Sequence, residues 1–128
     1  ISPQAKGLVW QVWSPEVSAA ARADGKLVFV DVTADWCITC KANKALVLEA
    51  APIGPLLGEL VNDGKLVMLK ADWTRPDPLI AAFLSSHQRF GIPFNIVYGL
   101  AAPEGIVLGE LLTANTVEKA LIEAALTR

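Results

Sequence analysis

The two cysteines of the chain stand three positions apart, in the segment Cys37-Ile38-Thr39-Cys40. This C-x-x-C spacing is typical of thiol–disulfide redox sites and of some metal-binding sites. A continuous apolar run, Leu27–Val32, precedes the segment, and a stretch with helical character follows it. We therefore expect Cys37 to lie at the junction between a buried strand and a helix.

A thiol in the first turn of a helix is expected to be reactive. The unpaired backbone N–H groups and the positive end of the helix dipole favour the thiolate there, and the thiolate is the nucleophilic form. Residues three apart share one helix face, so Cys40 can reach the sulfur of Cys37. The spacing predicts that Cys37 attacks a partner disulfide and that Cys40 then resolves the mixed disulfide.

Other interpretations of the cysteine pair are weaker. A structural zinc site needs about four ligands, and besides the cysteines the chain offers a single, distant histidine, His87. Covalent haem attachment needs a histidine directly after the second cysteine, but Lys41 occupies that position. A pair of inert, buried cysteines stays open as the third alternative, although the strand-to-helix context argues against it.

Asp31 and Trp36 are the neighbours that could modify this chemistry. Asp31 interrupts the apolar strand six residues before Cys37. Buried beneath the dithiol, its carboxyl would have a raised pKa and could accept a proton from Cys40. A solvent-facing position on the strand is the alternative. Trp36 directly precedes Cys37, and we expect it to flank the reactive sulfur.

Several other candidates have ordinary structural interpretations. Pro93 opens the apolar run Phe94–Tyr98 and is interpreted as an edge-strand proline, because cis X–Pro bonds are uncommon. His87 extends the apolar stripe of a helix and is interpreted as a packing residue. Asp72 and Thr74 are expected to shape the turn after a strand.

Hydrophobic periodicity and turn residues predict alternating strands and helices, which indicates an α/β sandwich. The segment Ile1–Val12 is expected to be irregular, with Trp10 and Trp13 as anchors, and the last two strands form an antiparallel pair. Five helices are expected: one capped by Ser14 and ended by Gly25, one from near Cys37 to about Glu49, one over Pro52–Asn62, one starting at Asp77-Pro78, and a last one near the C-terminal end. Asn115 and Glu118 would form a variant of the capping box at the start of the last helix. Its apolar face would consist of Val117, Ala120, Leu121, Ala124 and Ala125. Expected strands are Leu27–Val32, Leu66–Lys70, Phe94–Tyr98 and Ile106–Leu111, the last after a turn at Pro103-Glu104-Gly105.

The composition argues for one packed domain. The 128 residues are 53% hydrophobic and 19% charged, which suits a single core and not a disordered chain. A formal charge of −2 gives no basic field for nucleic acid or anionic lipid. No apolar run approaches the roughly 20 residues of a membrane helix. The chain begins at Ile1 without a signal-like segment, so we expect a mature protein or a domain of a longer one.

Several motifs resemble a known family. The run from Val30 to Lys41 resembles the active site of the thioredoxin superfamily. Four segments resemble, more narrowly, the C-terminal periplasmic domain of DsbD/ScsB-type thiol:disulfide interchange proteins, and the likeness extends from about Trp10 to Leu126. These segments are Trp13-Ser14-Pro15-Glu16, Thr33-Ala34-Asp35-Trp36-Cys37, Lys70-Ala71-Asp72-Trp73-Thr74 and Gly91-Ile92-Pro93-Phe94-Asn95-Ile96-Val97-Tyr98.

The resemblance implies a thioredoxin fold, a central mixed sheet of about four to five strands flanked by helices on both faces. It implies one such domain over residues 1–128, taken from a larger membrane protein and lying in the periplasm. Such a domain receives electrons from a membrane-embedded domain of the same protein family. It reduces disulfides in periplasmic proteins or domains, with no cofactor beyond its own redox-active disulfide.

The resemblance also implies roles for individual residues. Cys37 matches the nucleophile and Cys40 the resolving cysteine. Asp31 matches the buried acid that tunes the pair. Pro93 matches a cis-proline that faces the dithiol, and the backbone of Ile92 matches the strand edge that pairs with an extended partner segment.

Two positions depart from the family pattern. Lys44 stands where better-known members of the family carry a glutamate. A cation near Cys37 would favour the thiolate, so we expect a lower pKa for the Cys37 thiol than in those members. Ile38-Thr39 replaces the Gly-Pro of ordinary thioredoxins, so the reduction potential of thioredoxins cannot be assumed for the Cys37–Cys40 pair. Besides a reductase, an oxidase or isomerase and a redox-inactive peptide-binding module stay open as functions.

Overall fold

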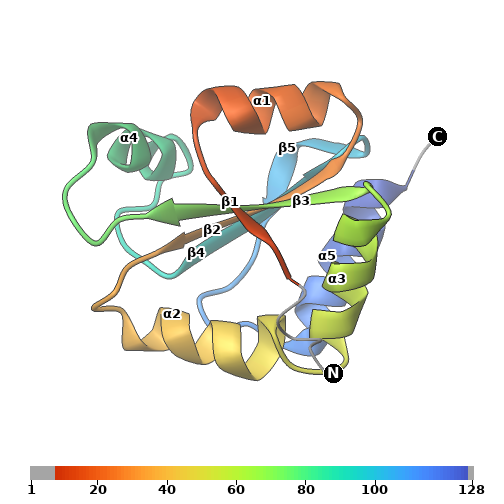
Figure 1. Ribbon diagram of the computed structural model, residues 1–128. Coiled ribbons are helices and arrows are strands. Elements are labelled where there is room, and N and C mark those ends of the chain that lie inside the picture. The colour runs from red at the N-terminus through yellow and green to blue at the C-terminus, as the bar shows by residue number, and fades with distance from the viewer. Residues whose placement is uncertain (1–7, 127–128) are drawn as a thin grey trace.

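The computed structural model describes residues 8–126 and shows a five-stranded mixed sheet with helices on both faces (Figure 1), which confirms the expected fold class. The strands are β1 (Trp10–Val12), β2 (Leu27–Thr33), β3 (Leu66–Asp72), β4 (Phe94–Gly99) and β5 (Ala102–Val107). The helices are α1 (Pro15–Ala23), α2 (Ile38–Asn43) with its π-helical continuation η2 (Lys44–Leu48), α3 (Ile53–Asn62), α4 (Pro78–Ser86) and α5 (Ala114–Ala125).

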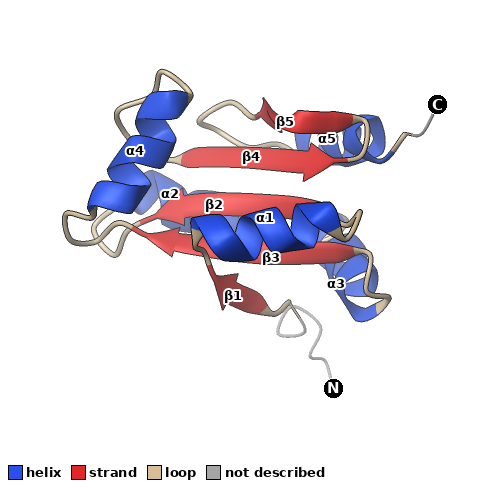
Figure 2. Ribbon diagram, turned by 90° about the horizontal axis from the view of Figure 1, so that it is seen from above, coloured by secondary structure: helices blue, strands red, loops and turns tan. Residues whose placement is uncertain are grey.

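The strands lie in the order β1-β3-β2-β4-β5. The first three run parallel, while β4 is antiparallel to β2 and β5 is antiparallel to β4. Figure 2 shows β2 in the middle of this sheet, with α1 crossing one face. The α1 and α4 helices cover that face, and α2, α3 and α5 cover the other (Figure 1). A strand covered on both faces has to be apolar throughout, which explains the run that opens at Leu27.

Alternation along β2 divides its side chains between two cores. Val28, Val30 and Val32 pack in the core under α1 and α4. Phe29 packs in the other core, with residues of η2, α3 and α5. Because successive strand residues point to opposite faces, Asp31 lies on the same face as Phe29, the face that α2 covers.

The N-terminal part differs from the sequence-based expectation. Residues 10–12, expected to be irregular, form β1, which pairs in parallel with β3 through Trp10 and Met68. Three residues are too few to show a period in sequence. The two tryptophans are anchors as expected, since the Trp10 ring lies edge-on to Phe29 and the Trp13 ring lies 5.0 Å from that of Phe83. The rest of the expected irregular segment includes residues 1–7, which lie outside the described part.

The expected turn at Pro103-Glu104-Gly105 is wrong. The chain turns earlier, after Gly99, and these three residues lie inside β5. An edge strand tolerates a proline, and Gly105 takes a φ of +89° beside an irregularity in the β4–β5 register. The segment 108–111, expected to be the end of the strand Ile106–Leu111, is a loop instead.

Two helix details also differ. The helix expected from Cys37 to Glu49 changes from α-helical to π-helical hydrogen bonding at Lys44. The capping box of α5 is made by Thr113 and Thr116, whose hydroxyls each accept a hydrogen bond from the other residue's backbone N–H, and not by Asn115 and Glu118. In addition, Ala125 is exposed, whereas the other four residues of the expected apolar face are buried.

Asn43 fixes the end of α2. Its side chain is buried, and its amide nitrogen donates to the carbonyl of Glu110 over 2.8 Å. Its amide oxygen accepts from the backbone N–H of Leu112 over 3.0 Å. One side chain therefore pairs two backbone groups of the loop between β5 and α5 and ties this loop to α2.

No single helix within residues 8–126 is long and apolar enough to cross a bilayer; only the bent pair Ile38–Leu48 and Ile53–Asn62 meets the length and composition criteria, when taken together.

Candidate active site

The cysteine pair lies at the expected junction of strand and helix. Cys37 and Cys40 form a disulfide with their Cα atoms 5.3 Å apart. Cys37 is the N-cap residue of α2, and its sulfur accepts a hydrogen bond from the backbone N–H of Cys40 over 3.2 Å. The same donor would stabilise a Cys37 thiolate in the reduced state, because a hydrogen bond to the charged form lowers a pKa.

Both cysteines are buried, and Cys37 is slightly the more exposed residue. Cys37 retains 6% of its surface and Cys40 only 2%, which agrees with Cys37 as the first sulfur that a partner meets. Both pack with Ala34, and Ile92 lies against this cluster. The residue before the pair, Trp36, and the residue after Cys37, Ile38, are largely exposed. They form an apolar rim around a nearly buried disulfide.

Ile92, from a distant part of the sequence, packs against the cluster of Ala34 and the two cysteines. The Ile92–Pro93 peptide bond is cis, as the family resemblance implied. The interpretation of Pro93 as an edge-strand proline is wrong, because β4 lies between β2 and β5 in the sheet. Pro93 directly precedes β4 and takes no part in its ladder. Sequence position alone could not show this, since strand order depends on tertiary structure.

Asp31 is buried in the middle of the sheet, with 3% of its surface exposed. Its strand neighbours are Lys70 on β3 and Asn95 on β4. Burial raises the pKa of Asp31 to about 6, and the positive charges of Lys44 and Lys70 limit the rise. The alternative of a solvent-facing carboxylate is therefore wrong, and Asp31 can take up or release a proton near neutral pH.

A small cleft of about 100 Å³ connects the inner cysteine to the lysines. Its lining includes Cys40, Lys41, Lys44 and Lys70. Polar clefts of this size can hold water. The Lys44 ammonium lies 4.7 Å from the centre of the Trp10 ring, a cation–π contact. Lys44 is thus positioned at the Cys40 side of the dithiol, where its charge also acts on Asp31.

Trp36 is held in place by the loop that follows β3. Its indole N–H donates to the carbonyl of Thr74 over 3.1 Å, and the Thr74 hydroxyl accepts from the backbone N–H of Asp35 over 2.9 Å. The Asp72 carboxylate in turn accepts from the backbone N–H and the hydroxyl of Thr74, which lowers the pKa of Asp72. The turn predicted for Asp72 and Thr74 is confirmed. Their hydrogen-bonded link to Trp36 was not predicted from the sequence.

An apolar groove of about 500 Å³ adjoins the dithiol. Trp36, Trp73, Phe90 and Ile92 line it, together with the loop residues 74–76 and Gly91. Phe90 is 80% exposed, which is unusual for so large an apolar side chain beside a reactive site. Sequence analysis did not single out Phe90. Its position directly before the Gly91-Ile92-Pro93 segment was the available signal.

The structure offers no metal alternative within residues 8–126, because no three side chains of histidine, cysteine, aspartate or glutamate gather there. His87 is the C-cap of α4, and its ring packs against Phe83 and Phe94. Burial lowers its pKa, and nearby Arg89 adds to this effect. The packing role expected for His87 is confirmed.

Comparison with known proteins gives consistent matches. The family model described as thioredoxin-like matches residues 9–99. Among curated proteins, the thiol:disulfide interchange protein DsbD of Ralstonia nicotianae is 32% identical over 113 residues, which are 82% of this chain and 18% of that protein. DsbD of Cronobacter sakazakii is 34% identical over 94 residues, or 71% of this chain and 15% of that protein. The chain thus spans less than a fifth of these relatives.

Solved structures agree on the fold. The C-terminal domain of Neisseria meningitidis DsbD in its oxidised form matches with a TM-score of 0.64 and 22% identity, over 91% of this chain and 99% of that one. A thioredoxin from Thermus thermophilus matches with a TM-score of 0.62 and 21% identity, over 91% and 86%. The chain belongs to the thioredoxin-like family, and its curated relatives include the thiol:disulfide interchange proteins named DsbD.

Proposed function

We propose that this chain is a protein-disulfide reductase domain, which passes electrons from a membrane-embedded partner domain to disulfides in other proteins. The observation that carries the proposal is the Cys37–Cys40 disulfide at the start of α2, with Cys37 the slightly more exposed residue and Ile92 beside it. Reaction at such a pair needs no metal or organic cofactor, because the two thiols supply both electrons.

The reaction proceeds in two exchanges. The Cys37 thiolate attacks one sulfur of the partner disulfide, forming a mixed disulfide and releasing the other partner sulfur as a thiolate. Cys40 then loses its proton and attacks the Cys37 sulfur, which restores the Cys37–Cys40 disulfide and releases the second partner sulfur. Two electrons pass to the partner in total, and its two sulfurs leave as thiolates that take up the protons lost by Cys37 and Cys40. Reduction by the donor domain runs the same steps in reverse.

Asp31 is the proton acceptor for the second exchange in this scheme. Cys40 is nearly buried, and a thiol in that position needs a base to become a nucleophile. A carboxyl with a pKa of about 6 is largely ionised at neutral pH and can accept that proton. The cleft lined by Cys40, Lys44 and Lys70 can hold water beside the Cys40 thiol. The charges of Lys44 and Lys70 stabilise the ionised carboxylate of Asp31.

The partners and the location follow from the relatives. The curated relatives are named thiol:disulfide interchange proteins, and this chain matches less than a fifth of their length. We infer that the domain lies in the periplasm as part of a larger membrane protein. Its partners are periplasmic proteins or domains that carry disulfides. Trp36, Ile92 and Pro93 form the surface that a partner's extended segment meets, by strand pairing beside the dithiol.

Loss of each cysteine should produce a different defect. Cys37→Ser removes the attacking sulfur, so we expect no disulfide transfer to a model disulfide substrate. Cys40→Ala removes the resolving sulfur, so we expect a stable mixed disulfide, visible on a non-reducing gel. Transfer that persists in Cys37→Ser would contradict the mechanism. Partner binding that survives the loss of both thiols would favour a peptide-binding module instead.

The direction of transfer is set by the reduction potential. The helix N-terminus and Lys44 favour the Cys37 thiolate, and a more stable thiolate makes the cysteine pair more oxidising. The second candidate function is therefore an oxidase or isomerase. For a reductase we expect a potential at or below about −220 mV, measured in defined thiol buffers with Trp36 fluorescence as the reporter. A value near about −120 mV would mark a disulfide donor.

Asp31→Asn should remove the pH dependence of stability that the buried carboxyl causes. Between pH 4 and 6 the folded protein holds a proton on Asp31 that the unfolded chain has lost, so stability falls as pH rises through this window. A shift from 3.8 to about 6 corresponds to about 3 kcal/mol. We expect the variant to be up to about that much more stable than wild type at pH 8 and equally stable at pH 4, by denaturant unfolding.

The same variant should slow release of the mixed disulfide by roughly a hundredfold or more, since a general base is lost. Glu123→Gln, an exposed carboxylate on α5, serves as the control and should change neither property. If the stability of Asp31→Asn varied with pH in the same way as that of wild type, burial would not disfavour the ionised form of the Asp31 carboxyl. An unchanged release rate would remove it from the proton path.

Lys44→Glu tests the departure from the family pattern. Replacing the cation with a carboxylate should disfavour the Cys37 thiolate, so the pH profile of Cys37 alkylation in the reduced protein should move up by roughly half a unit to one unit. Lys119→Glu makes the same charge change at an exposed position on α5 and should leave the profile in place. Identical profiles for wild type and Lys44→Glu would refute the role of Lys44.

A further inference from the structure

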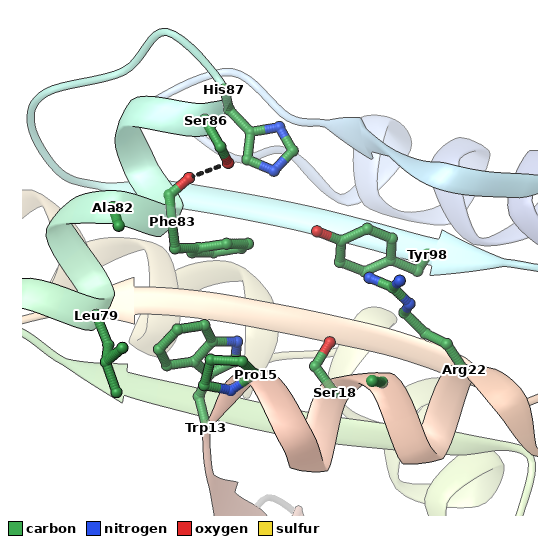
Figure 3. A pocket seen from close by; sticks show the side chains of 11 residues that line it. Trp13, Pro15, Ser18, Arg22, Leu79, Ala82, Phe83, Ser86, His87 and Tyr98 are labelled. Atoms are coloured by element: carbon green, nitrogen blue, oxygen red, sulfur yellow. Dashed lines mark hydrogen bonds between the residues drawn. The ribbon is translucent and has the colours of Figure 1, made fainter.

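A second pocket lies away from the dithiol, between α1 and α4 on the face of the sheet opposite α2 (Figure 3). Its volume is about 400 Å³, within the range of small-molecule sites. None of its lining residues belongs to the candidate active site. The lining consists of Trp13, Pro15, Ser18, Ala19, Arg22, Leu79, Ala82, Phe83, Ser86, His87 and Tyr98.

One wall of this pocket is aromatic. The rings of Trp13 and Phe83 lie 5.0 Å apart with their planes tilted by 35°, and Leu79 extends the wall along α4. Trp13 is nearly buried, so its ring is fixed by the core and does not have to be ordered when a ligand arrives. A preformed aromatic wall suits a flat apolar group.

The other wall carries hydrogen-bond donors. Figure 3 shows the hydroxyls of Ser18 and Tyr98 directed into the space between the helices. Ser18 and Tyr98 are both nearly buried, with 5% and 4% of their surfaces exposed. Each hydroxyl can donate a hydrogen bond to an acceptor that enters the pocket.

The charges of the pocket favour an anion. None of the described residues that line it is acidic, and Arg22 supplies a full positive charge. The Arg22 guanidinium lies 4.6 Å from the centre of the Tyr98 ring, which holds it at the wall that carries the hydroxyls. Burial lowers the pKa of His87, so this residue adds no second fixed charge at neutral pH.

We propose that the α1–α4 pocket binds a small aromatic carboxylate, with its ring against Trp13 and Phe83 and its carboxylate at Arg22, Ser18 and Tyr98. Arginine binds a carboxylate through charge-assisted hydrogen bonds, and the two hydroxyls complete its coordination. The inference does not depend on the proposed redox function, because the site shares no residue with the dithiol.

A titration with 2-naphthylacetate and its uncharged analogue 2-naphthylacetamide tests the proposal. We expect the acid to shift the Trp13 indole signal in a ¹H–¹⁵N NMR spectrum, with a dissociation constant of about 1 mM or tighter. The signal is assigned with Trp13→Phe. The amide should bind at least about fivefold more weakly, since it lacks the charge that Arg22 recognises. Arg22→Gln should weaken binding of the acid by a similar factor and leave the amide unchanged.

Two variants of α4 locate the site. Ala82 lines the pocket and is exposed, so Ala82→Trp should fill the pocket and abolish binding without disturbing the core. Ala81 is its exposed neighbour and does not line the pocket, so Ala81→Trp should bind as wild type does. Reduction of a model disulfide should be the same in both variants, which separates failure of this site from failure of the redox proposal.

Three results would overturn the inference. An absence of shifts at about 10 mM acid would show that the pocket does not bind this chemistry. Equal affinity for the acid and the amide would show an apolar pocket without selectivity for an anion. Equal binding by Ala82→Trp and Ala81→Trp would place the ligand elsewhere on the surface.

Discussion

The burial of β2 between two helical layers is the constraint on which the rest of the structure depends. The strand pairs with β3 on one side and β4 on the other, so its backbone has almost no freedom. Both its faces are covered, and only Asp31 and Thr33 bring polar atoms into it. The strand ends at Thr33, four residues before Cys37, so only a short loop separates the reactive cysteine from the fixed centre of the sheet.

Burial disfavours the charged form of both Asp31 and Cys40. It makes a carboxylate unfavourable at Asp31, which raises its pKa, and it makes Cys40 inert unless a base is close. Lys44 and Lys70 reduce the first cost by supplying positive charge. If Asp31 serves Cys40 as proposed, a change of charge at either group should alter the proton affinity of the other.

Local patterns were enough to predict much of this structure. The continuous apolar run of β2, the C-x-x-C spacing and the proline-led starts of α1 and α4 are properties of neighbouring residues, and all of them are confirmed. The errors concern features decided by distant parts of the chain. Pro103 could lie inside a strand only because β5 is at the edge of the sheet. The Trp36 hydrogen bond joins residues 38 positions apart, and no local period reports such a contact.

Asn43 has a consequence for how the site can respond to oxidation and reduction. The far end of α2 is tied to the loop before α5 by two hydrogen bonds from one buried amide, while the near end carries Cys37. Breaking the Cys37–Cys40 bond changes the distance between two sulfurs at the near end alone. Because its other end is fixed, we expect any difference between the oxidised and reduced forms to be confined to the first turn of the helix. A partner would then recognise the redox state from the surface around Cys37.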